Sequence, residues 1–345
     1  MKKKNIFSFT LLVSTFISAC SPATDVTTPV KTQDNINIVK ENLVQYVNPL
    51  MGTDSKHSLS NGNTYPAIAT PWGMNFWTPM TAEMGNGWTY NYNDNKIRGI
   101  KQTHQPSPWL NDYAAFSLMA VTGDLKFKEE ERQSWFSHKA EQSAPHFYQV
   151  YLADYDVTAE VTPTERAAHF RFTFPDTDNA YIILDAFDKG SMVKIIPEQR
   201  KIIGYARNNH GGVPENFHNY FVAQFDKDFD VNHTWKDGWR LVKDSKNSEG
   251  DHVGAIIGFK TNKGEQVHVK VASSFISHEQ ALLNLEREIG SDSFATTKTK
   301  AHDAWQTELS RLRIEDDNVE DVRKAINYIN EKEPTEGYDI YTTIF

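Results

Sequence analysis

The fold of this chain is decided by three successive segments: YVNPLMGTDSKHSLSNGNTYPAIATPWGMNFWTPM (Tyr46–Met80), GNGWTYNYNDNKIRG (Gly85–Gly99) and KQTHQPSPWLNDYAAFSLMAV (Lys101–Val121). Glycine, proline, asparagine and threonine interrupt the aromatic residues, so the aromatics do not form one continuous apolar strand face. This mixture is typical of loops that a rigid scaffold presents to a polar ligand, and a sugar is the obvious ligand class. The competing interpretation is that the tryptophans pack in a core, as aromatics of β-rich proteins usually do.

Downstream of this stretch, the apolar residues come in short runs of strand length separated by turn-rich segments. Val267, Val269 and Val271 alternate with polar residues, which is the pattern of a strand with one wet face. Many short strands without intervening helices predict a mainly β fold, a large two-sheet antiparallel β-sandwich. The expected strands are Phe116–Val121, Phe147–Leu152, Val157–Thr162, His169–Phe174, Tyr181–Phe187, Tyr220–Phe225, Gly254–Phe259 and Val267–Ser273.

A short helical linker is expected to follow the sandwich. Ser277 can cap a helix, and Gln280 stands three residues further on, as in a capping box, before the helix ends at Gly290. A second helix is expected from Phe294 to about Leu312, because apolar residues repeat there at helical spacing. Both helices are expected to fold back on the sandwich.

The amino terminus has the pattern of a bacterial lipoprotein signal. A run of lysines precedes a short apolar region, and Ile17–Cys20 reads ISAC, which resembles a lipobox with Cys20 as the acylated residue. An exported lipoprotein is therefore expected, on the outer membrane, in the periplasm or at the cell surface, with the lipid anchor as its contact to the membrane. The alternative is an ordinary signal peptide followed by a stray cysteine. Cys20 is the only cysteine, which excludes an internal disulfide and a thiolate metal cluster.

Composition limits the classes of partner. The 345 residues suffice for a sizeable core, and the net charge of −9 with a pI near 5.7 argues against nucleic acid, which calls for a basic face. The expected organisation is a lipoprotein signal peptide (1–20), a flexible tether (21–42), the sandwich (43–275), a helical linker (276–317) and a divergent tail (318–345).

Several segments resemble, in order and spacing, the amino-terminal region of glycoside hydrolase family 92, the calcium-dependent α-mannosidases. The first of them are YVNPLMGT, NTYPAIATPWGM, GNGWTYNY, IRGIKQTHQ and NDYAAFSLMAVTG, and the later ones are IIGYAR, NYFVAQFDKDF, GAIIGFK and VKVASSFISHEQALLNLEREIG. The resemblance covers about Val44 to Asp317.

The resemblance implies an amino-terminal β-sandwich and helical linker, followed in the family by an (α/α)6 barrel that carries the catalytic carboxylates and most of the calcium site. The chain is expected to lack that barrel and to supply neither catalytic nor metal residues, although calcium is expected for the full-length family enzyme. The family's sandwich loops reach a mannose pocket, so the expected ligands are mannose-containing glycans. The candidate sugar contacts are Trp88, His104, Gln105 and Asp112, with His57 as a weaker candidate.

Each candidate has a structural alternative, in which the same groups only hold the long loops in shape. Asp112 is expected to cap a loop or bind a sugar hydroxyl rather than act as a catalytic acid, because an inverting glycosidase needs a second carboxylate across the bond. Asp226, Asp228 and Asp230 alternate as DxDxD, but no glycine or terminal glutamate completes a calcium loop, so a solvated turn is expected.

Three functions stay open at this stage. The first is the carbohydrate-binding part of an α-mannosidase, inactive alone, with a possible separate catalytic domain. The second is a standalone surface carbohydrate-binding module, and the third is a non-functional truncated product. After Asp317 the sequence departs from the family pattern, and a truncated start of the catalytic domain, a frameshift or a genuine variant would all look like this.

Overall fold

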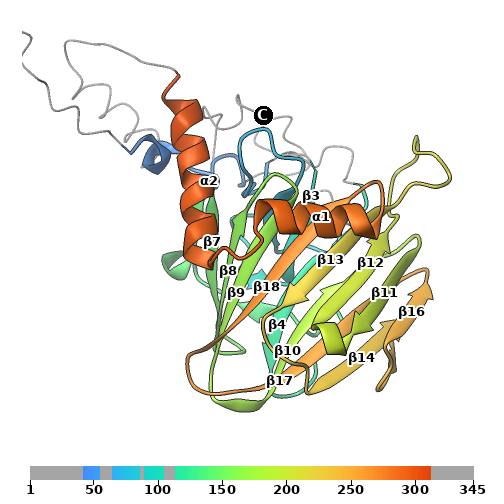
Figure 1. The fold of residues 1–345 in the computed structure, drawn as a ribbon. Coiled ribbons are helices and arrows are strands. Elements are labelled where there is room, and N and C mark those ends of the chain that lie inside the picture. Colours follow the sequence, from blue (N-terminus) through green and yellow to red (C-terminus); the bar gives the residue numbers. More distant parts are fainter. Residues whose placement is uncertain (1–41, 55–63, 86–88, 105–112, 312–345) are drawn as a thin grey trace, which may run out of the picture. The chain divides into compact units, whose positions relative to one another are not determined.

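The fold is an antiparallel β-sandwich with two helices packed on one side (Figure 1). A computed structural model describes residues 42–54, 64–85, 89–104 and 113–311. The seven-stranded sheet has the order β1 (Phe76–Met80), β3 (Gly99–Thr103), β4 (Ser117–Thr122), β10 (Thr177–Asp185), β17 (Val253–Thr261), β14 (Val231–Lys236) and β15 (Arg240–Val242).

The nine-stranded sheet forms the other layer. Its order is β16 (Asn247–Gly250), β11 (Ser191–Ile196), β12 (Lys201–Ala206), β13 (Asn219–Phe225), β18 (Glu265–Ser274), β9 (Ala167–Phe174), β8 (Val157–Pro163), β7 (Phe147–Leu152) and β6 (Gln142–Ala144). A two-stranded sheet and three short 3₁₀ helices complete the described part: β2 (Lys96–Ile97), β5 (Ser134–Trp135), η1 (Leu43–Tyr46), η2 (His138–Ala140) and η3 (Pro197–Gln199).

The core lies between the two large sheets and is rich in aromatic rings. Trp77 of β1 meets Phe170 of β9 edge to face at 5.1 Å, and Phe116 meets Phe221 of β13 at 4.5 Å. Each pair joins one sheet to the other, and such pairs stabilise a fold beyond the apolar area that they bury. The core interpretation is therefore correct for Trp77, which is fully buried.

The prediction of a two-sheet antiparallel sandwich is confirmed, and each of the eight expected strands is present to within a few residues. The largest displacement is in β10, which begins four residues before the expected Tyr181. Its first residues are polar and exposed, and the pairing with β17 changes register between Thr177 and Ala180, so no apolar alternation marks the start. Val267, Val269 and Val271 are buried as expected.

The sequence interpretation missed several strands, among them β11 and β12, and two of those missed bury polar residues or contain proline. β1 contains Pro79, and β3 carries Lys101 and Gln102, which are both buried. Binary patterning identifies a strand through apolar residues on its buried face. A strand that buries lysine and glutamine against other polar groups therefore gives no such signal.

The two helices lie on the outer face of the nine-stranded sheet (Figure 1). α1 (His278–Glu288) is capped by Ser277, whose Oγ accepts from Gln280 N at 3.1 Å, as expected. The reciprocal half of the capping box is not formed, because the Gln280 side chain donates to Asn284 instead. Leu285 buries against Ala272 and Val222 of the sheet, so the expected docking of α1 is confirmed.

α2 (Phe294–Leu309) is three residues shorter than expected, because Ser310 caps its carboxyl end. Trp305, in the middle of its apolar stripe, is fully buried, and its Nε1 donates to Ala69 O at 2.7 Å. The side chain of Gln306 accepts from Leu43 N at 2.8 Å. These contacts fix the carboxyl-terminal end of α2 to the segments that precede β1.

The close approach of β14 and β17 makes Gly254 a sensitive position. A Cβ at Gly254 would lie 2.0 Å from the ring of Trp235 and 2.6 Å from Leu184 O. We expect Gly254→Ala to lower the free energy of unfolding by about 1–3 kcal/mol, because the buried indole must shift. Urea denaturation would measure the loss, with Lys260→Ala on the same strand as an exposed control that stays within about 0.5 kcal/mol. Equal midpoints for both variants would contradict this packing.

Candidate functional site

One end of the sandwich collects the stretch that the sequence singled out. We call it the loop end: β1 and β13 begin there, at Phe76 and Asn219, and β3 and β18 end there, at Thr103 and Ser274. His104 directly follows β3 at this end. The segments before β1 and between β3 and β4 therefore emerge together, as a ligand site built from loops requires.

A buried network of amide side chains, here called the amide network, joins the two sheets at the loop end. Ser273 Oγ of β18 accepts from Gln102 Nε2 at 2.7 Å and from Asn75 Nδ2 at 2.9 Å. Asn219 Nδ2 donates to Gln102 Oε1 at 3.0 Å. All four residues have essentially no exposed surface. Removing one partner would leave a buried polar group unsatisfied, which costs about 1–3 kcal/mol.

Asn208, which follows β12, fixes the start of the segment that leads into β4. Its carbonyl accepts from Ala114 N at 2.6 Å, while its side chain accepts from Ala115 N at 3.0 Å and donates to Ala115 O at 2.8 Å. Asn219 Nδ2 also donates to Ala114 O at 3.0 Å. Ala114 has a φ of 51°, a left-handed conformation that these hydrogen bonds hold in place.

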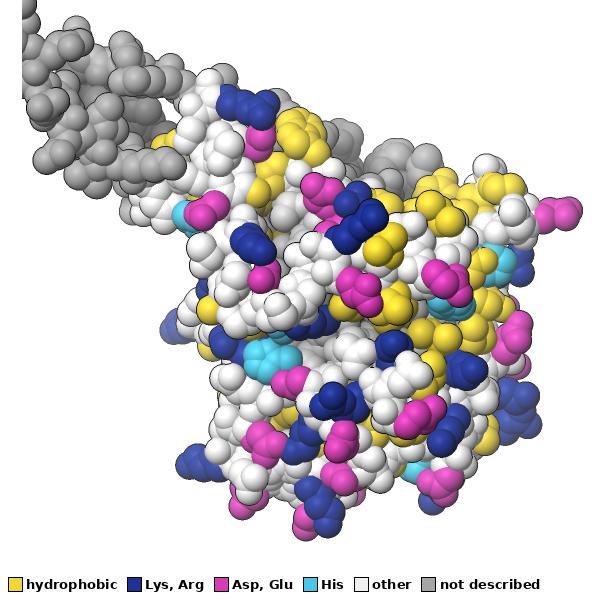
Figure 2. Space-filling model, in the orientation of Figure 1, with side chains coloured by type: hydrophobic (Ala, Val, Ile, Leu, Met, Phe, Trp, Pro, Cys, Tyr) yellow, Lys and Arg dark blue, Asp and Glu magenta, His cyan; other side chains and the backbone are white. Residues whose placement is uncertain are grey.

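A row of rings, the aromatic row, lies at the rim of the loop end. His104 is 5.1 Å from Phe275, Phe275 stacks on Phe217 at 5.5 Å, and Phe217 meets Tyr113 edge to face at 6.4 Å. Phe275 is 41% exposed and the adjacent Ile276 is 74% exposed. Hydrophobic side chains gather beside α1 at this end of the surface (Figure 2). The row offers apolar faces at which the ring of a sugar can stack.

A cavity of about 100 Å³ opens beside Asn208, and we call it the Lys101 pocket. Lys101 is 1% exposed, and its Nζ donates to Met84 O at 3.1 Å and to Thr89 Oγ1 at 3.4 Å. Amides, an imidazole, an ammonium group, a carboxylate and a phenyl ring meet around a small volume, which suits a ligand with several hydroxyl groups. The lining residues are Met84, Gly85, Lys101, Phe187, Asp188, Lys189, Asn208, Asn209 and His210.

Asp188 is the acidic group of the Lys101 pocket. Its Oδ1 is buried and has no hydrogen-bond partner among the residues that the structure describes. Burial raises the pKa of this carboxyl above its usual range, and the nearby charges of Lys189 and His252 only partly oppose the shift. A buried acceptor without a donor is a position at which a ligand hydroxyl can bind.

A charged layer lies under the pocket, on the outer face of the seven-stranded sheet. Asp185 is fully buried at the end of β10, accepting from Arg132 Nη1 at 2.9 Å and lying 2.7 Å from His252 Nε2. Burial alone would raise the pKa of Asp185, but the charges of His252 and Arg132 outweigh it and lower the pKa well below its usual range. Phe187, in the pocket wall, donates its backbone N–H to the same carboxylate at 3.0 Å.

Of the candidate sugar contacts, only His104 lies within the described residues, where it heads the aromatic row. Trp88, Gln105, Asp112 and His57 lie outside the described residues, as does Cys20. The sequence interpretation did not select the residues of the Lys101 pocket. The one sequence signal is Lys101 directly after Ile100 in the matched segment IRGIKQTHQ, because lysine is rarely buried in a strand unless its charge is paired.

Trp72 also differs from the expectation of a packed aromatic residue. It is 68% exposed, and its backbone has a φ of 61°. A bulky residue in this left-handed region is uncommon and strained. Trp72 precedes β1, so its indole stands at the loop end without the burial that usually stabilises a tryptophan.

The described residues offer no cluster of three or more His, Cys, Asp or Glu side chains that could hold a metal ion. The DxDxD aspartates have separate partners: Asp226 accepts from His268 N, Asp230 accepts from Lys260 N, and Asp228 is exposed beside Arg200. The donor set in the described part therefore does not fit the calcium ion that the family resemblance implies, and no step is assigned to calcium.

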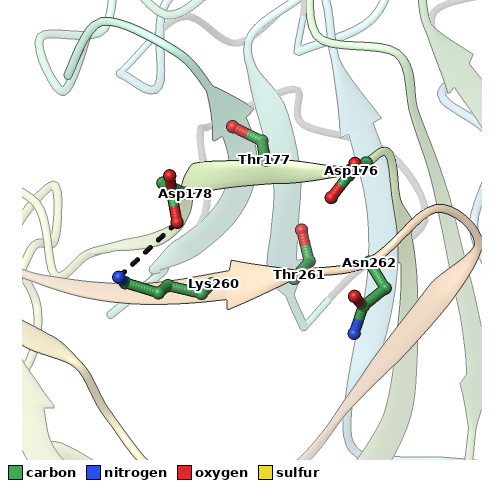
Figure 3. Close-up of a pocket in the computed structure, with 6 residues that line it drawn as sticks. All are labelled: Asp176, Thr177, Asp178, Lys260, Thr261 and Asn262. Atoms are coloured by element: carbon green, nitrogen blue, oxygen red, sulfur yellow. Dashed lines mark ion pairs between the residues drawn. The ribbon is translucent and has the colours of Figure 1, made fainter.

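A wider hollow of about 320 Å³ lies at the opposite end of β10 (Figure 3). Its two carboxylates, Asp176 and Asp178, come from one short segment, and Asp178 pairs with Lys260 at 3.5 Å. Two acids on the same side of a hollow do not provide an acid and a base on opposite sides of a glycosidic bond. This surface serves as a matched control for the loop end.

The architecture is a two-sheet domain with a helical extension, and residues 46–274 match the profile of the glycosyl hydrolase family 92 N-terminal domain. The chain belongs to glycosyl hydrolase family 92. A family GH92 inverting mannosidase from Bacteroides thetaiotaomicron is 42% identical, with a TM-score of 0.76, over 79% of this chain and 37% of its own.

Two further relatives extend the comparison. A family GH92 α-mannosidase from Bacteroides thetaiotaomicron, solved in complex with mannoimidazole, is 31% identical, with a TM-score of 0.71, over 80% of this chain and 38% of its own. An uncharacterized secreted glycosidase from Arthroderma benhamiae is 21% identical over 81% of this chain and 40% of its own length. The chain thus spans about two fifths of the length of these relatives.

The pH dependence of stability tests the charged layer. Burial would lower the pKa of His252, but the charge of Asp185 and the hydrogen bond to it raise the pKa above its usual value. The ion pair therefore stabilises the fold fully below the pKa that His252 has in the unfolded chain, about 6.5. This stabilisation is lost as the pH rises through the pKa that His252 has in the folded protein. We expect His252→Gln to lower the urea midpoint more at pH 6 than at pH 9. The same loss at both pH values would show that the ion pair does not form.

Proposed function

We propose that this chain forms the carbohydrate-binding wall of a family 92 glycosidase that acts on mannose-containing glycans. The Lys101 pocket carries the proposal, because it places a buried, unpartnered carboxylate oxygen of Asp188 beside amide and imidazole groups. Polar groups that converge on a small cavity orient hydroxyl groups, and the neighbouring aromatic row offers ring faces. The mannosidase names of two relatives support mannose as the sugar class.

Hydrolysis would require polypeptide beyond these 345 residues. An inverting glycosidase uses an acid and a base far enough apart to admit a water molecule between base and sugar. The resemblance assigns both groups, and most of the calcium site, to a barrel domain. We infer that the chain contributes binding and orientation of the glycan, while a catalytic part contributes proton transfer; a standalone glycan-binding module would use the same pocket.

Calorimetric titration with α-mannobiose tests the binding proposal. We expect measurable heat at millimolar sugar, and at least threefold weaker binding for Asp188→Asn and His210→Ala, since the first removes the negative charge of the carboxylate and the second removes the imidazole. His210 is exposed, so its substitution leaves the fold intact. Asp178→Asn, in the hollow at the opposite end of β10, is the matched control and retains the affinity of the unchanged protein.

Two results would overturn the binding proposal. No heat at millimolar mannobiose or mannan would end it, and equal affinity of Asp188→Asn, His210→Ala and the unchanged protein would place the sugar elsewhere. Hydrolysis of the sugar by the purified chain would overturn the division between binding and catalysis.

We also propose that the chain is exported and held at a membrane through acylated Cys20. The ISAC segment after a basic, apolar start supports this, and one relative is described as a secreted glycosidase. In the described part, neither α1 nor α2 has the length and apolar character to cross a membrane. Acyl chains on Cys20 would supply membrane affinity, since they contribute about 0.8 kcal/mol per buried CH₂.

Fractionation of the producing cells tests the anchor. We expect the unchanged protein in the membrane fraction and Cys20→Ser in the soluble fraction, because serine cannot carry the thioether-linked lipid. A serine substitution elsewhere in the tether, Thr24→Ser, controls for changes in export. Membrane-bound Cys20→Ser would refute lipid attachment at this residue.

A further inference from the structure

Four histidines lie where the amino-terminal half of α2 meets the nine-stranded sheet. We call them the histidine seam: His146 before β7, His169 of β9, His268 of β18 and His302 of α2. His169 Nε2 lies 3.2 Å from His268 Nδ1, and the rings of His146 and His302 meet edge to face at 5.1 Å. Histidine and cationic side chains gather where α2 meets the sheet (Figure 2).

The seam is part of the docking contact of α2. Phe294, the first residue of the helix, packs against His169 at 5.4 Å and His268 at 6.3 Å. One turn further on, Thr297 is buried, with its Oγ1 3.4 Å from His169 Nδ1. Loss of the seam geometry would therefore remove the packing under the first two turns of α2.

Cations and anions are present in equal number around the seam. Arg171 lies 4.4 Å above the Phe294 ring, and the Lys298 ammonium lies 3.2 Å from the Phe147 ring centroid. Glu160 is engaged by Arg171 through two hydrogen bonds of 2.6 Å. The other charged groups near the seam, from each packed element, are Asp226, Lys270, Asp292, Lys300 and Asp303.

The contact between His169 and His268 requires at least one neutral imidazole. Between His169 and His268, one ring N–H can donate to the lone pair of the other ring, but two protonated rings would oppose two N–H groups at 3.2 Å. Burial is the main cause that lowers the pKa of His169 to about 3, and the charges of His268, Lys270 and Arg171 contribute to the same shift. Burial is also the main cause that lowers the pKa of His146 to about 3, and the charges of His302 and Lys298 contribute to this shift.

We propose that the histidine seam is a pH-sensitive clasp, in which proton uptake on acidification releases the amino-terminal half of α2 from the sheet while the sandwich stays folded. The carboxyl-terminal half keeps its own anchors, the hydrogen bonds of Trp305 to Ala69 and of Leu43 to Gln306. The device would loosen the packing of residues 294–302 on the sandwich and leave the carboxyl-terminal half of α2 in place. It does not depend on the sugar-binding proposal.

The direction and size of the effect follow from proton linkage. The released state binds more protons than the docked state, so docking is favoured at high pH and is lost as the pH falls from about 6.5 toward the depressed values. Each histidine that is neutral while α2 is docked and protonated once α2 is released shifts the docking equilibrium by up to tenfold per pH unit in this window. His146 and His169 together would shift it about 300-fold between pH 6.5 and pH 5.

Hydrogen exchange of the full chain at pH 7.5 and pH 5.0, corrected for the intrinsic pH dependence of exchange, tests the clasp. We expect the protection of amides in residues 294–302 to fall at least a hundredfold at pH 5.0, while peptides from β10 and β17 keep theirs. The double variant His146→Gln and His169→Gln cannot take up these protons and keeps the helix protected at pH 5.0. His218→Gln, outside the seam, behaves like the unchanged protein.

Three results would overturn the proposal: equal protection of residues 294–302 at both pH values, simultaneous loss of protection in the sandwich strands, or an unchanged pH response in the double variant. If the double variant does not fold, imidazole titration of the unchanged protein by NMR decides. Ring signals of His146 and His169 that titrate near pH 6.5 while α2 stays protected would exclude the clasp, and signals that change together with helix release would support it.

Discussion

The loop end depends on the amide network, in which Gln102 of one sheet is hydrogen-bonded to both Asn219 and Ser273 of the other. An apolar contact here would hold the sheets together but would permit small sliding, whereas directional hydrogen bonds in a buried site specify one arrangement. Asn219 and Asn208 extend the same constraint to the backbone at Ala114. The backbone at Ala114 and Ala115 is therefore held in place by the pairing of the sheets.

A second polar region, the charged layer of Arg132, Asp185 and His252, supports the Lys101 pocket from below. Burying charge is costly unless each group is paired and hydrogen-bonded, and Asp185 meets this condition with two side chains and a backbone N–H. Fully buried Trp235 and Asp185 both pair with Gly254, so they share one face of the seven-stranded sheet. Apolar and charged groups are thus buried together on this face.

How far the sequence predicted the molecule depended on where polar residues were buried. The alternating valines of β18 and the cap at Ser277 gave correct elements, because each rests on local periodicity. Strand β3 and the Lys101 pocket gave no comparable signal, because Lys101, Asp188 and Asn208 meet only through the pairing of distant strands. Resemblance to a family identified the loop end and His104, yet it did not single out the pocket beside them.

The turn at Trp72 raises a question that folding alone does not answer. Glycine would adopt its left-handed backbone without strain, and a small polar residue would suit its exposure, so neither local geometry nor core packing accounts for an indole. Strain of this kind persists where a residue serves something besides stability. The consequence is a large flat apolar ring displayed to solvent shortly before β1.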